Sequence, residues 1–182
     1  MAKALATRLD GLVLIEPVVH GDSRGFFLET YALEEWKGLG VDADFVQQNH
    51  SRSSYGTLRG LHFQTSPGQA KLIRCGRGRI LDVAADLRRE SPTFGEWEAH
   101  VLDDENCHQL YVPIGFAHGF VVLSEVADVN YQVSSLYDPV TEAGIAWDDP
   151  DVGVDWQVAE PLLSERDKTA PHLSEIADSL PW

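Results

Sequence analysis

The segment "AKLIRCGRGRILDVAADL", residues 70–87, is the stretch that decides the fold class. On both sides of its centre, apolar residues alternate with polar or small ones, which is typical of short β-strands. The central "CGRGR", residues 75–79, carries the glycines of a tight turn. The segment is therefore predicted to form two short strands that follow one another closely.

Eight further runs of this kind lie along the chain, separated by turn residues. They cover residues 11–19, 44–51, 57–64, 96–102, 108–113, 119–124, 128–135 and 143–149. Helix signals are confined to residues 30–40 and 172–180. Ten strand candidates at close spacing predict an all-β sandwich or barrel with short flanking helices.

The length and composition fit one globular domain. The chain has 182 residues, of which 43% are hydrophobic and 24% charged, and this length is short for two ordinary domains. From about Asp149 the sequence becomes acidic and rich in Pro and Asp, without alternation. We expect a single domain over residues 1–182, with a core at about 12–148 and a tail at 149–182 that packs over the barrel.

The charge and the chain ends limit the possible partners and locations. The formal net charge is −15, which argues against nucleic acid or an anionic membrane as a partner. The two cysteines, Cys75 and Cys107, are too few for a disulfide framework. The first residues, "MAKALATRLDGLVLIEP", are interrupted by charges and fail as a secretory signal, so the cytoplasm is the expected location.

Several polar side chains fall on faces that could line a ligand site. A strand over "FVQQNHS" places Gln47, Asn49 and Ser51 on one face. This face either points to solvent or, if several polar faces converge inside a barrel mouth, binds a hydroxylated ligand. Lys71 and Asp82 lie on faces with apolar neighbours, so they are either a structural pair or parts of an anion-stabilising site.

His62 in "TLRGLHFQ" has three interpretations: metal ligand, proton-transfer base or core imidazole. A jelly-roll metal site usually has a second histidine two residues on, and here that position is Gln64. The later "VPIGFAHGF", with His118, matches only the second half of such a site. Proton transfer needs a base, an acid and a cation, and His62, Tyr131 and Lys71 supply these three types.

Six segments, in order along the chain, resemble one known family. They are "DSRGFFLETY", "FVQQNHSRSSYGTLRGLHFQ", "AKLIRCGRGRILDVAADLRRESPTFGEW", "LYVPIGFAHGFVVLS", "YDPVTEAGIAWDDPDVGVDW" and "LLSERD". Together they resemble the dTDP-4-dehydrorhamnose 3,5-epimerases. The resemblance implies a cupin-like jelly roll (double-stranded β-helix), a homodimer with shared strands, and epimerisation of dTDP-4-keto-6-deoxyglucose through an enolate, without a metal or other cofactor.

The resemblance also implies roles for individual residues. His62 matches the general base, Asp167 the carboxylate that orients it, Tyr131 the general acid and Lys71 the cation at the enolate. The implied substrate contacts are Arg24, Glu29, Gln47, Asn49, Arg59, His118, Glu142 and Lys168. In a dimer that shares strands, Arg24 and Glu29 would serve the partner subunit's site.

The spacing of Arg59 and His62 predicts a backbone irregularity. Residues three apart in a regular strand point to opposite faces, so both can line one site only if Gly60 bulges or kinks the strand. The sequence leaves three alternatives open: an epimerase that inverts carbon 3 or carbon 5 alone, a metal-dependent cupin enzyme with His62 and His118 as ligands, and a sugar-binding jelly roll without activity.

Overall fold

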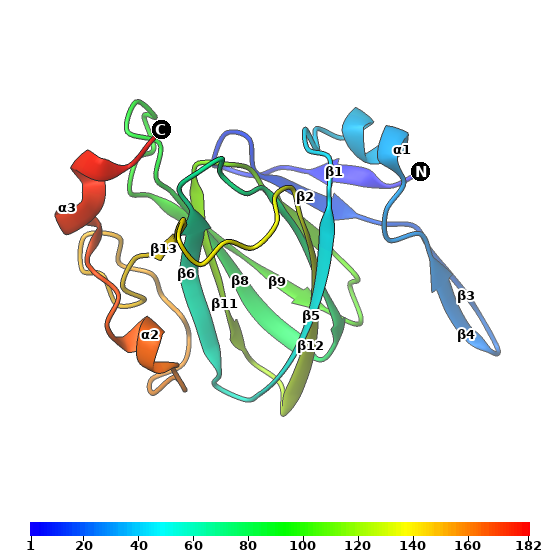
Figure 1. Cartoon of the computed structure of the whole chain (residues 1–182). Helices are drawn as coiled ribbons and strands as arrows, with labels where there is room; N and C mark the ends of the chain where they lie inside the picture. Colours follow the sequence, from blue (N-terminus) through cyan, green and yellow to red (C-terminus); the bar gives the residue numbers. More distant parts are fainter.

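Two antiparallel sheets lie face to face in the computed structural model, which describes residues 1–182 (Figure 1). The six-stranded sheet consists, in spatial order, of β1 (Lys3–Leu5), β2 (Val13–Glu16), β10 (Gln109–Val112), β7 (Lys71–Arg77), β12 (Val126–Val133) and β5 (Gln47–Ser54). The five-stranded sheet consists of β13 (Glu142–Gly144), β6 (Leu58–Gln64), β11 (Phe116–Val122), β8 (Arg79–Asp86) and β9 (Trp97–Asp103). The prediction of an all-β fold with two facing layers is confirmed.

The remaining elements are short and lie at the edges. A separate hairpin of β3 (Val19–Asp22) and β4 (Gly25–Leu28) projects from the body (Figure 1). The helices are α1 (Leu33–Gly38), α2 (Glu165–Lys168) and α3 (Leu173–Ile176), with the 3₁₀ turn η1 (Ala177–Ser179). No helix is long and apolar enough to pass through a lipid bilayer.

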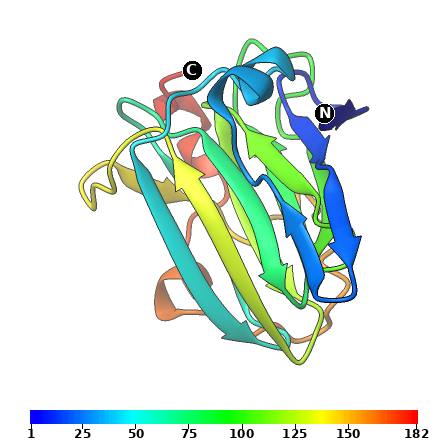
Figure 2. The same cartoon turned by 90° about the vertical axis from the view of Figure 1, so that its right-hand side faces the viewer.

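The turn in residues 75–79 does not close a hairpin. Strand β7 pairs with β10 and β12, whereas β8 pairs with β11 and β9 (Figures 1 and 2). The chain therefore crosses from one sheet to the other at Gly78. This glycine has φ +78°, and a Cβ there would lie 2.1 Å from the Val126 carbonyl oxygen, so no other residue fits.

The other differences from the sequence prediction have local causes. The candidate strand at 11–19 pairs only over Val13–Glu16, as β2, and ends before Pro17, because proline cannot donate a hydrogen bond to a sheet. The candidate at 143–149 pairs only at Glu142–Gly144 and then leaves β6. Strands β1 and β4 and helix α2 were not predicted, since three or four residues carry too little periodicity to recognise.

Three apolar clusters hold the layers together. The first lies between the sheets and contains residues of β7 and β8 such as Ile73 and Ile80. The second covers the outer face of the five-stranded sheet, where Trp156 and Leu173 of the C-terminal tail join it. The third lies between the six-stranded sheet and α1, around the fully buried Trp36. The hydrophobic effect thus fixes both the two-layer barrel and the tail that covers one of its faces.

Strand β6 contains the predicted irregularity. His62 pairs with His118 of β11, but Arg59 pairs with Phe120, so three steps along β6 correspond to two along β11. Gly60 has φ +139°, and a Cβ there would lie 2.4 Å from the Gly119 Cα atom. Because of this bulge, the Arg59 and His62 side chains point to the same side of β6 and line the same cavity.

Replacing Gly60 with alanine is therefore expected to lower the free energy of unfolding by about 1–3 kcal/mol, since the methyl group has no space and the backbone is in a region that favours glycine. Urea denaturation measures this change. Gly38→Ala, at the end of α1 where an added Cβ meets nothing within 4 Å, serves as the control and should leave the stability nearly unchanged. A Gly60→Ala protein as stable as the parent would contradict the assigned role of the bulge.

Candidate active site

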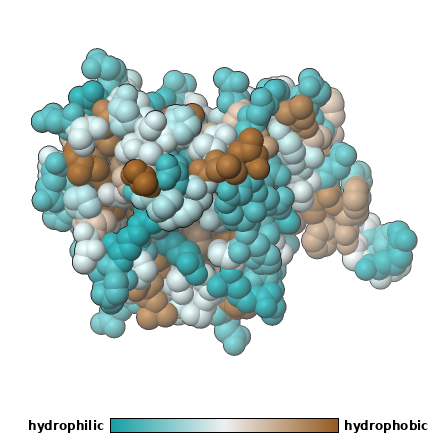
Figure 3. All heavy atoms as spheres, in the orientation of Figure 1, coloured by the Kyte–Doolittle hydropathy of each residue, from teal (hydrophilic) through white to brown (hydrophobic).

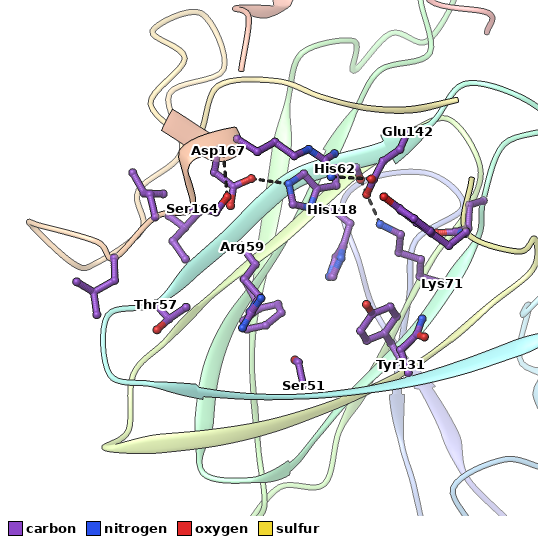
Figure 4. Close-up of a pocket in the computed structure, with 18 of the residues that line it drawn as sticks. Ser51, Thr57, Arg59, His62, Lys71, His118, Tyr131, Glu142, Ser164 and Asp167 are labelled. Carbon is purple, nitrogen blue, oxygen red and sulfur yellow. Dashed lines mark hydrogen bonds and ion pairs between the residues drawn. The ribbon is translucent and has the colours of Figure 1, made fainter. Parts of the chain in front are cut away.

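A cavity of about 560 Å³ opens between the two sheets beside the C-terminal tail (Figure 4). Its walls carry side chains from β5, β7 and β12 of one sheet, from β6, β11 and β13 of the other, and from the segment around α2. Nine residues predicted from the sequence line it: Gln47, Asn49, Arg59, His62, Lys71, His118, Tyr131, Glu142 and Asp167. The polar face of β5 predicted from "FVQQNHS" thus points into the barrel, not to solvent.

His62 and Asp167 form a close pair at one wall of the cavity. The His62 Nε2 atom lies 2.6 Å from the Asp167 Oδ1 atom. Asp167 is buried on α2, and the Ser164 side chain caps this helix by accepting a hydrogen bond from the Asp167 backbone N–H. With the carboxylate as acceptor, Nε2 carries the imidazole proton and the Nδ1 lone pair is free to accept another.

The charge on Asp167 is stabilised by its neighbours. Burial by itself raises the pKa of this carboxyl group, but the hydrogen bonds from His62 and Ser164 and the charges of His62 and Arg166 leave its pKa below the usual value. Asp167 is therefore an anion at neutral pH. It can hold the imidazole in one tautomer and stabilise the imidazolium that forms when His62 takes up a proton.

Lys71 is a buried cation that lines the cavity. Its Nζ atom donates a hydrogen bond to the His62 carbonyl oxygen at 3.2 Å. Burial lowers the pKa of Lys71 to about 8, against the opposing charges of Glu142 and Asp82. The residue is thus still mainly charged at neutral pH and can stabilise a negative charge that develops nearby.

Tyr131 reaches the cavity from β12, in the sheet opposite to that of His62 (Figure 4). Burial raises its pKa, so the hydroxyl group stays protonated at neutral pH and can act as an acid. A base on one sheet and an acid on the other can act on opposite faces of a molecule bound between them.

His118 forms a second histidine–carboxylate pair. Its Nε2 atom lies 2.9 and 3.0 Å from the two carboxylate oxygens of Asp82. Burial lowers the pKa of His118, although Asp82 acts in the opposite direction, so the ring is neutral at neutral pH. Asp82 therefore pairs with His118, and the direct pairing with Lys71 that the sequence allowed is not formed.

Two guanidinium groups, those of Arg59 and Arg166, line the cavity. Arg59 donates hydrogen bonds from Nε and Nη2 to the Ser53 hydroxyl at 3.1 and 3.0 Å. Arg166 forms an ion pair with Glu142, with 2.6 Å between Nη1 and Oε2. Guanidinium groups suit phosphate oxygens because they bind them in pairs.

Three of the predicted residues lie outside this cavity. Lys168 is exposed and pairs with Glu165 at 2.6 Å. Arg24 pairs with Asp22 at the tip of the β3–β4 hairpin and is 88% exposed, and Glu29 follows the hairpin. One chain does not bring Arg24 and Glu29 to its own site, so their roles stay predictions that depend on a partner subunit.

The sequence analysis did not single out several residues that line the cavity. The most important is Arg166, which precedes Asp167 in "LSERD". Its positive charge beside a predicted site residue could have indicated an anion contact. The others are Thr57, Gln69, Tyr137 and Ser164. They come from turns and loops, where no periodic pattern indicates which side chains point inward.

The donor arrangement does not support a metal site. No group of three or more His, Cys, Asp or Glu residues is placed so that it could hold a metal ion. His62 and His118 are neighbours across β6 and β11, but each bonds to a different carboxylate, Asp167 and Asp82. The metal-dependent alternative thus lacks its ligand set.

A two-sheet β-barrel that holds a His–Asp pair, a buried lysine and a tyrosine in one polar cavity has the parts of a cupin-type proton-transfer enzyme. The chain belongs to the dTDP-4-dehydrorhamnose 3,5-epimerase family, whose sequence model matches residues 6–175.

Individual relatives agree with this assignment over nearly their whole length. The dTDP-4-dehydrorhamnose 3,5-epimerase of Pseudomonas aeruginosa is 47% identical over 98% of this chain and 99% of the relative. A crystal structure of a dTDP-6-deoxy-D-glucose-3,5-epimerase from Legionella pneumophila, in complex with dTDP-4-keto-L-rhamnose, is 43% identical with a TM-score of 0.96, covering 100% of this chain and 98% of that chain. A 3'-monoepimerase from Streptomyces bikiniensis, in complex with dTDP-quinovose, is 39% identical with a TM-score of 0.88, covering 94% and 88%.

The His62–Asp167 geometry predicts the tautomer of the base. In ¹⁵N NMR spectra of the free protein, neutral His62 is expected to carry its proton on Nε2 and none on Nδ1. Asp167→Asn should shift the ring toward the Nδ1–H tautomer, because an amide can donate to Nε2 where the carboxylate can only accept.

Glu98→Gln is the matched control for this measurement. Glu98 bonds to another imidazole, that of His100, at 2.9 Å, so its replacement should leave the His62 signals unchanged. A proton on Nδ1 of His62 in the parental protein would contradict the assigned geometry.

Proposed function

We propose that this protein converts dTDP-4-keto-6-deoxy-D-glucose to dTDP-4-keto-L-rhamnose by inverting carbons 3 and 5, a step of dTDP-L-rhamnose biosynthesis. The observation that carries the proposal is that His62, Asp167, Tyr131 and Lys71 line one and the same cavity of this chain. The chain's membership of the family supports the same reaction. The relative from Legionella, with dTDP-4-keto-L-rhamnose bound, supports the choice of substrate.

In the proposed reaction His62 removes a proton next to the keto group. The electrons of the broken C–H bond move onto the oxygen at carbon 4, giving an enolate and an imidazolium. Asp167, 2.6 Å from the ring, stabilises this imidazolium. General base catalysis of this kind contributes typically about 10² to 10⁴-fold to the rate.

Tyr131 then returns a proton from the opposite face, which inverts the carbon. Its place on the sheet facing His62 and its protonated state at neutral pH support this role. Proton exchange with water restores Tyr131 and His62, and the same steps at the second carbon complete the reaction. Because each step transfers a proton between substrate, side chain and water, this series of steps requires no redox cofactor.

Lys71 would stabilise the enolate oxygen as a buried ammonium group. A charged donor in a site of low water content interacts more strongly than it would in solution. Removal of one such donor lowers the rate of the reaction roughly 10² to 10³-fold in comparable oxyanion sites. Hydrogen-bond partners for the sugar hydroxyls and for the thymine base of the nucleotide are offered by Gln47, Asn49, His118 and Glu142.

The diphosphate needs local cations because the protein carries a net charge of −15. Arg59 and Arg166 line the cavity and are proposed to bind it. Lys168, which the resemblance implied as a further substrate contact, is exposed and pairs with Glu165 outside the cavity. Binding of phosphate to Arg166 would compete with its ion pair to Glu142.

We further propose that the protein is a homodimer in which the hairpin reaches the partner. Phe26 and Phe27 on β4 are 60% and 66% exposed, and Figure 3 shows apolar side chains gathered on the projecting hairpin beside a hydrophilic tip. An apolar surface of this kind on an extended arm favours burial against another chain. Arg24 and Glu29 would then complete the partner's site.

The extent and location of the protein follow the same proposal. We take residues 1–182 as one epimerase domain, because the tail at 149–182 shares an apolar cluster with the five-stranded sheet and supplies Asp167. A cytoplasmic location is supported by Cys75 and Cys107, which are both free thiols.

A 3-epimerase is the second candidate function, since a 3'-monoepimerase is among the structural relatives. Incubation of the keto sugar with the protein in deuterated water separates the two, because each inverted carbon takes up solvent deuterium. We expect deuterium at carbons 3 and 5, and uptake at carbon 3 alone would establish the single inversion.

His62→Ala is the matching control for this experiment and should lower the exchange rate by about 10² to 10⁴-fold, while circular dichroism stays unchanged. No deuterium uptake at either carbon with the parental protein would overturn the proposed function. Exchange by His62→Ala at the parental rate would remove His62 from the mechanism.

Mixing two inactive variants tests the shared site. Arg24→Ala and His62→Ala should each be weakly active alone, but in a mixed dimer the Arg24→Ala chain keeps His62 and receives Arg24 from its partner. After subunit exchange at equal amounts, half of the dimers are mixed with one complete site each, so about a quarter of the parental activity should return. No recovery, with dimer formation verified by light scattering, would place Arg24 outside the partner's site.

A further inference from the structure

Asp82 is an unusually poorly satisfied buried carboxylate. It is 0% exposed, and its only hydrogen-bond donor is His118 Nε2, shared by both oxygens at 2.9 and 3.0 Å. Asp86, on the same strand and equally buried, accepts from Arg88, Ser91 and Thr93. A buried carboxylate is costly without donors or a cation, so a further interaction must offset the burial of Asp82.

The cation that can provide this interaction is Lys71. Asp82 lies on β8 and Lys71 on β7, in opposite sheets, and the neighbours Ile80 and Ile73 from the same two faces pack in one cluster between them. Neither a salt bridge nor a hydrogen bond joins the two side chains directly, so the interaction acts through space. Both side chains are buried, so screening between them is weaker than between exposed charges.

The other charged groups around Lys71 do not replace Asp82. Glu142 on β13 has the larger effect on Lys71, but Arg166 on α2 pairs with Glu142 and opposes it. His62 on β6 offers Lys71 a carbonyl oxygen, and His118 on β11 is neutral because burial lowers its pKa. Asp82 is thus the carboxylate near Lys71 whose charge no guanidinium group compensates.

The same carboxylate determines the orientation of His118. With Asp82 as acceptor, His118 carries its proton on Nε2 and leaves Nδ1 as an acceptor. Since His118 lines the cavity, Nδ1 is the atom that a substrate hydroxyl group can bind. One buried carboxylate therefore acts on two residues of the cavity without lining it.

We propose that Asp82 is a positioning residue of the active site, which keeps Lys71 charged and holds His118 with Nδ1 free for the substrate. The proposal rests on the proposed function in naming a substrate. The state of the two side chains is a property of the free protein and can be measured without any activity.

Asp82→Asn is the decisive variant, since it removes the charge and retains an acceptor of the same shape. An ammonium group is present below its pKa, and loss of a nearby anion favours the neutral amine. The Lys71 titration, expected near pH 8 in the parental protein, should move down by about one pH unit. The basic limb of the kcat/KM pH profile should move by the same amount.

The Lys71 titration is best followed by NMR of the lysine ε-CH₂ groups. The chain has four lysines, Lys3, Lys37, Lys71 and Lys168, and the Lys71 signal is identified by its loss in Lys71→Met. Asp86→Asn is the matched control, because it removes an equally buried carboxylate from the same strand. It should lower the stability while Lys71 titrates as in the parent.

The outcomes are distinct. A Lys71 titration at the parental pH in folded Asp82→Asn would overturn the proposal. If that variant does not fold, the ¹³Cγ signal of Asp82 in the parental protein decides: a step at the pH where Lys71 titrates supports the proposal, and its absence overturns it. If the parental protein shows no epimerase activity, the proposed function fails, and the NMR titration still decides the relation between Asp82 and Lys71.

Discussion

The hydrogen bond between His62 and Asp167 joins two parts of the chain that are 105 residues apart. His62 lies on β6 of the barrel and Asp167 on α2 of the tail, so this bond exists only when the tail lies against the five-stranded sheet. The apolar contacts of Trp156 and Leu173 hold the tail there, and the Thr57–Leu162 bridge and the Ser164 cap place α2 beside β6. The geometry of the proposed base thus depends on hydrophobic packing well away from it.

The interior of the barrel combines apolar packing with buried charge. Ile73 and Ile80 fill the space between the sheets, and Lys71, Asp82 and His118 lie buried beside them. Charged groups in such a place cost stability unless they are paired. Their presence is understandable where the site needs a cation and a neutral imidazole in fixed positions, and the apolar clusters on both outer faces offset the cost.

The sequence predicted the parts of this structure that have a local signal. Alternation identified most strands, and the spacing of Arg59 and His62 predicted the irregularity at Gly60. The placement of β7 and β8 in different sheets could not be predicted from alternation, because strand partners are set by contacts far along the chain. The sequence analysis did not single out Arg166 for a related reason: residues two apart in a helix, such as Arg166 and Lys168, point in nearly opposite directions, and only the packing of α2 decides that Arg166 faces the cavity.

The tail also affects when and how long the site is complete. Asp167 follows all the barrel strands along the chain, and α2 has only four residues, so the position of α2 depends on the docking of the whole tail. Short elements at the periphery open more readily than a central sheet. During synthesis the barrel strands are made first, and the orienting carboxylate follows them. A local opening of the tail separates the histidine from its carboxylate while the barrel stays folded, so catalytic competence is a less durable property of this molecule than its fold.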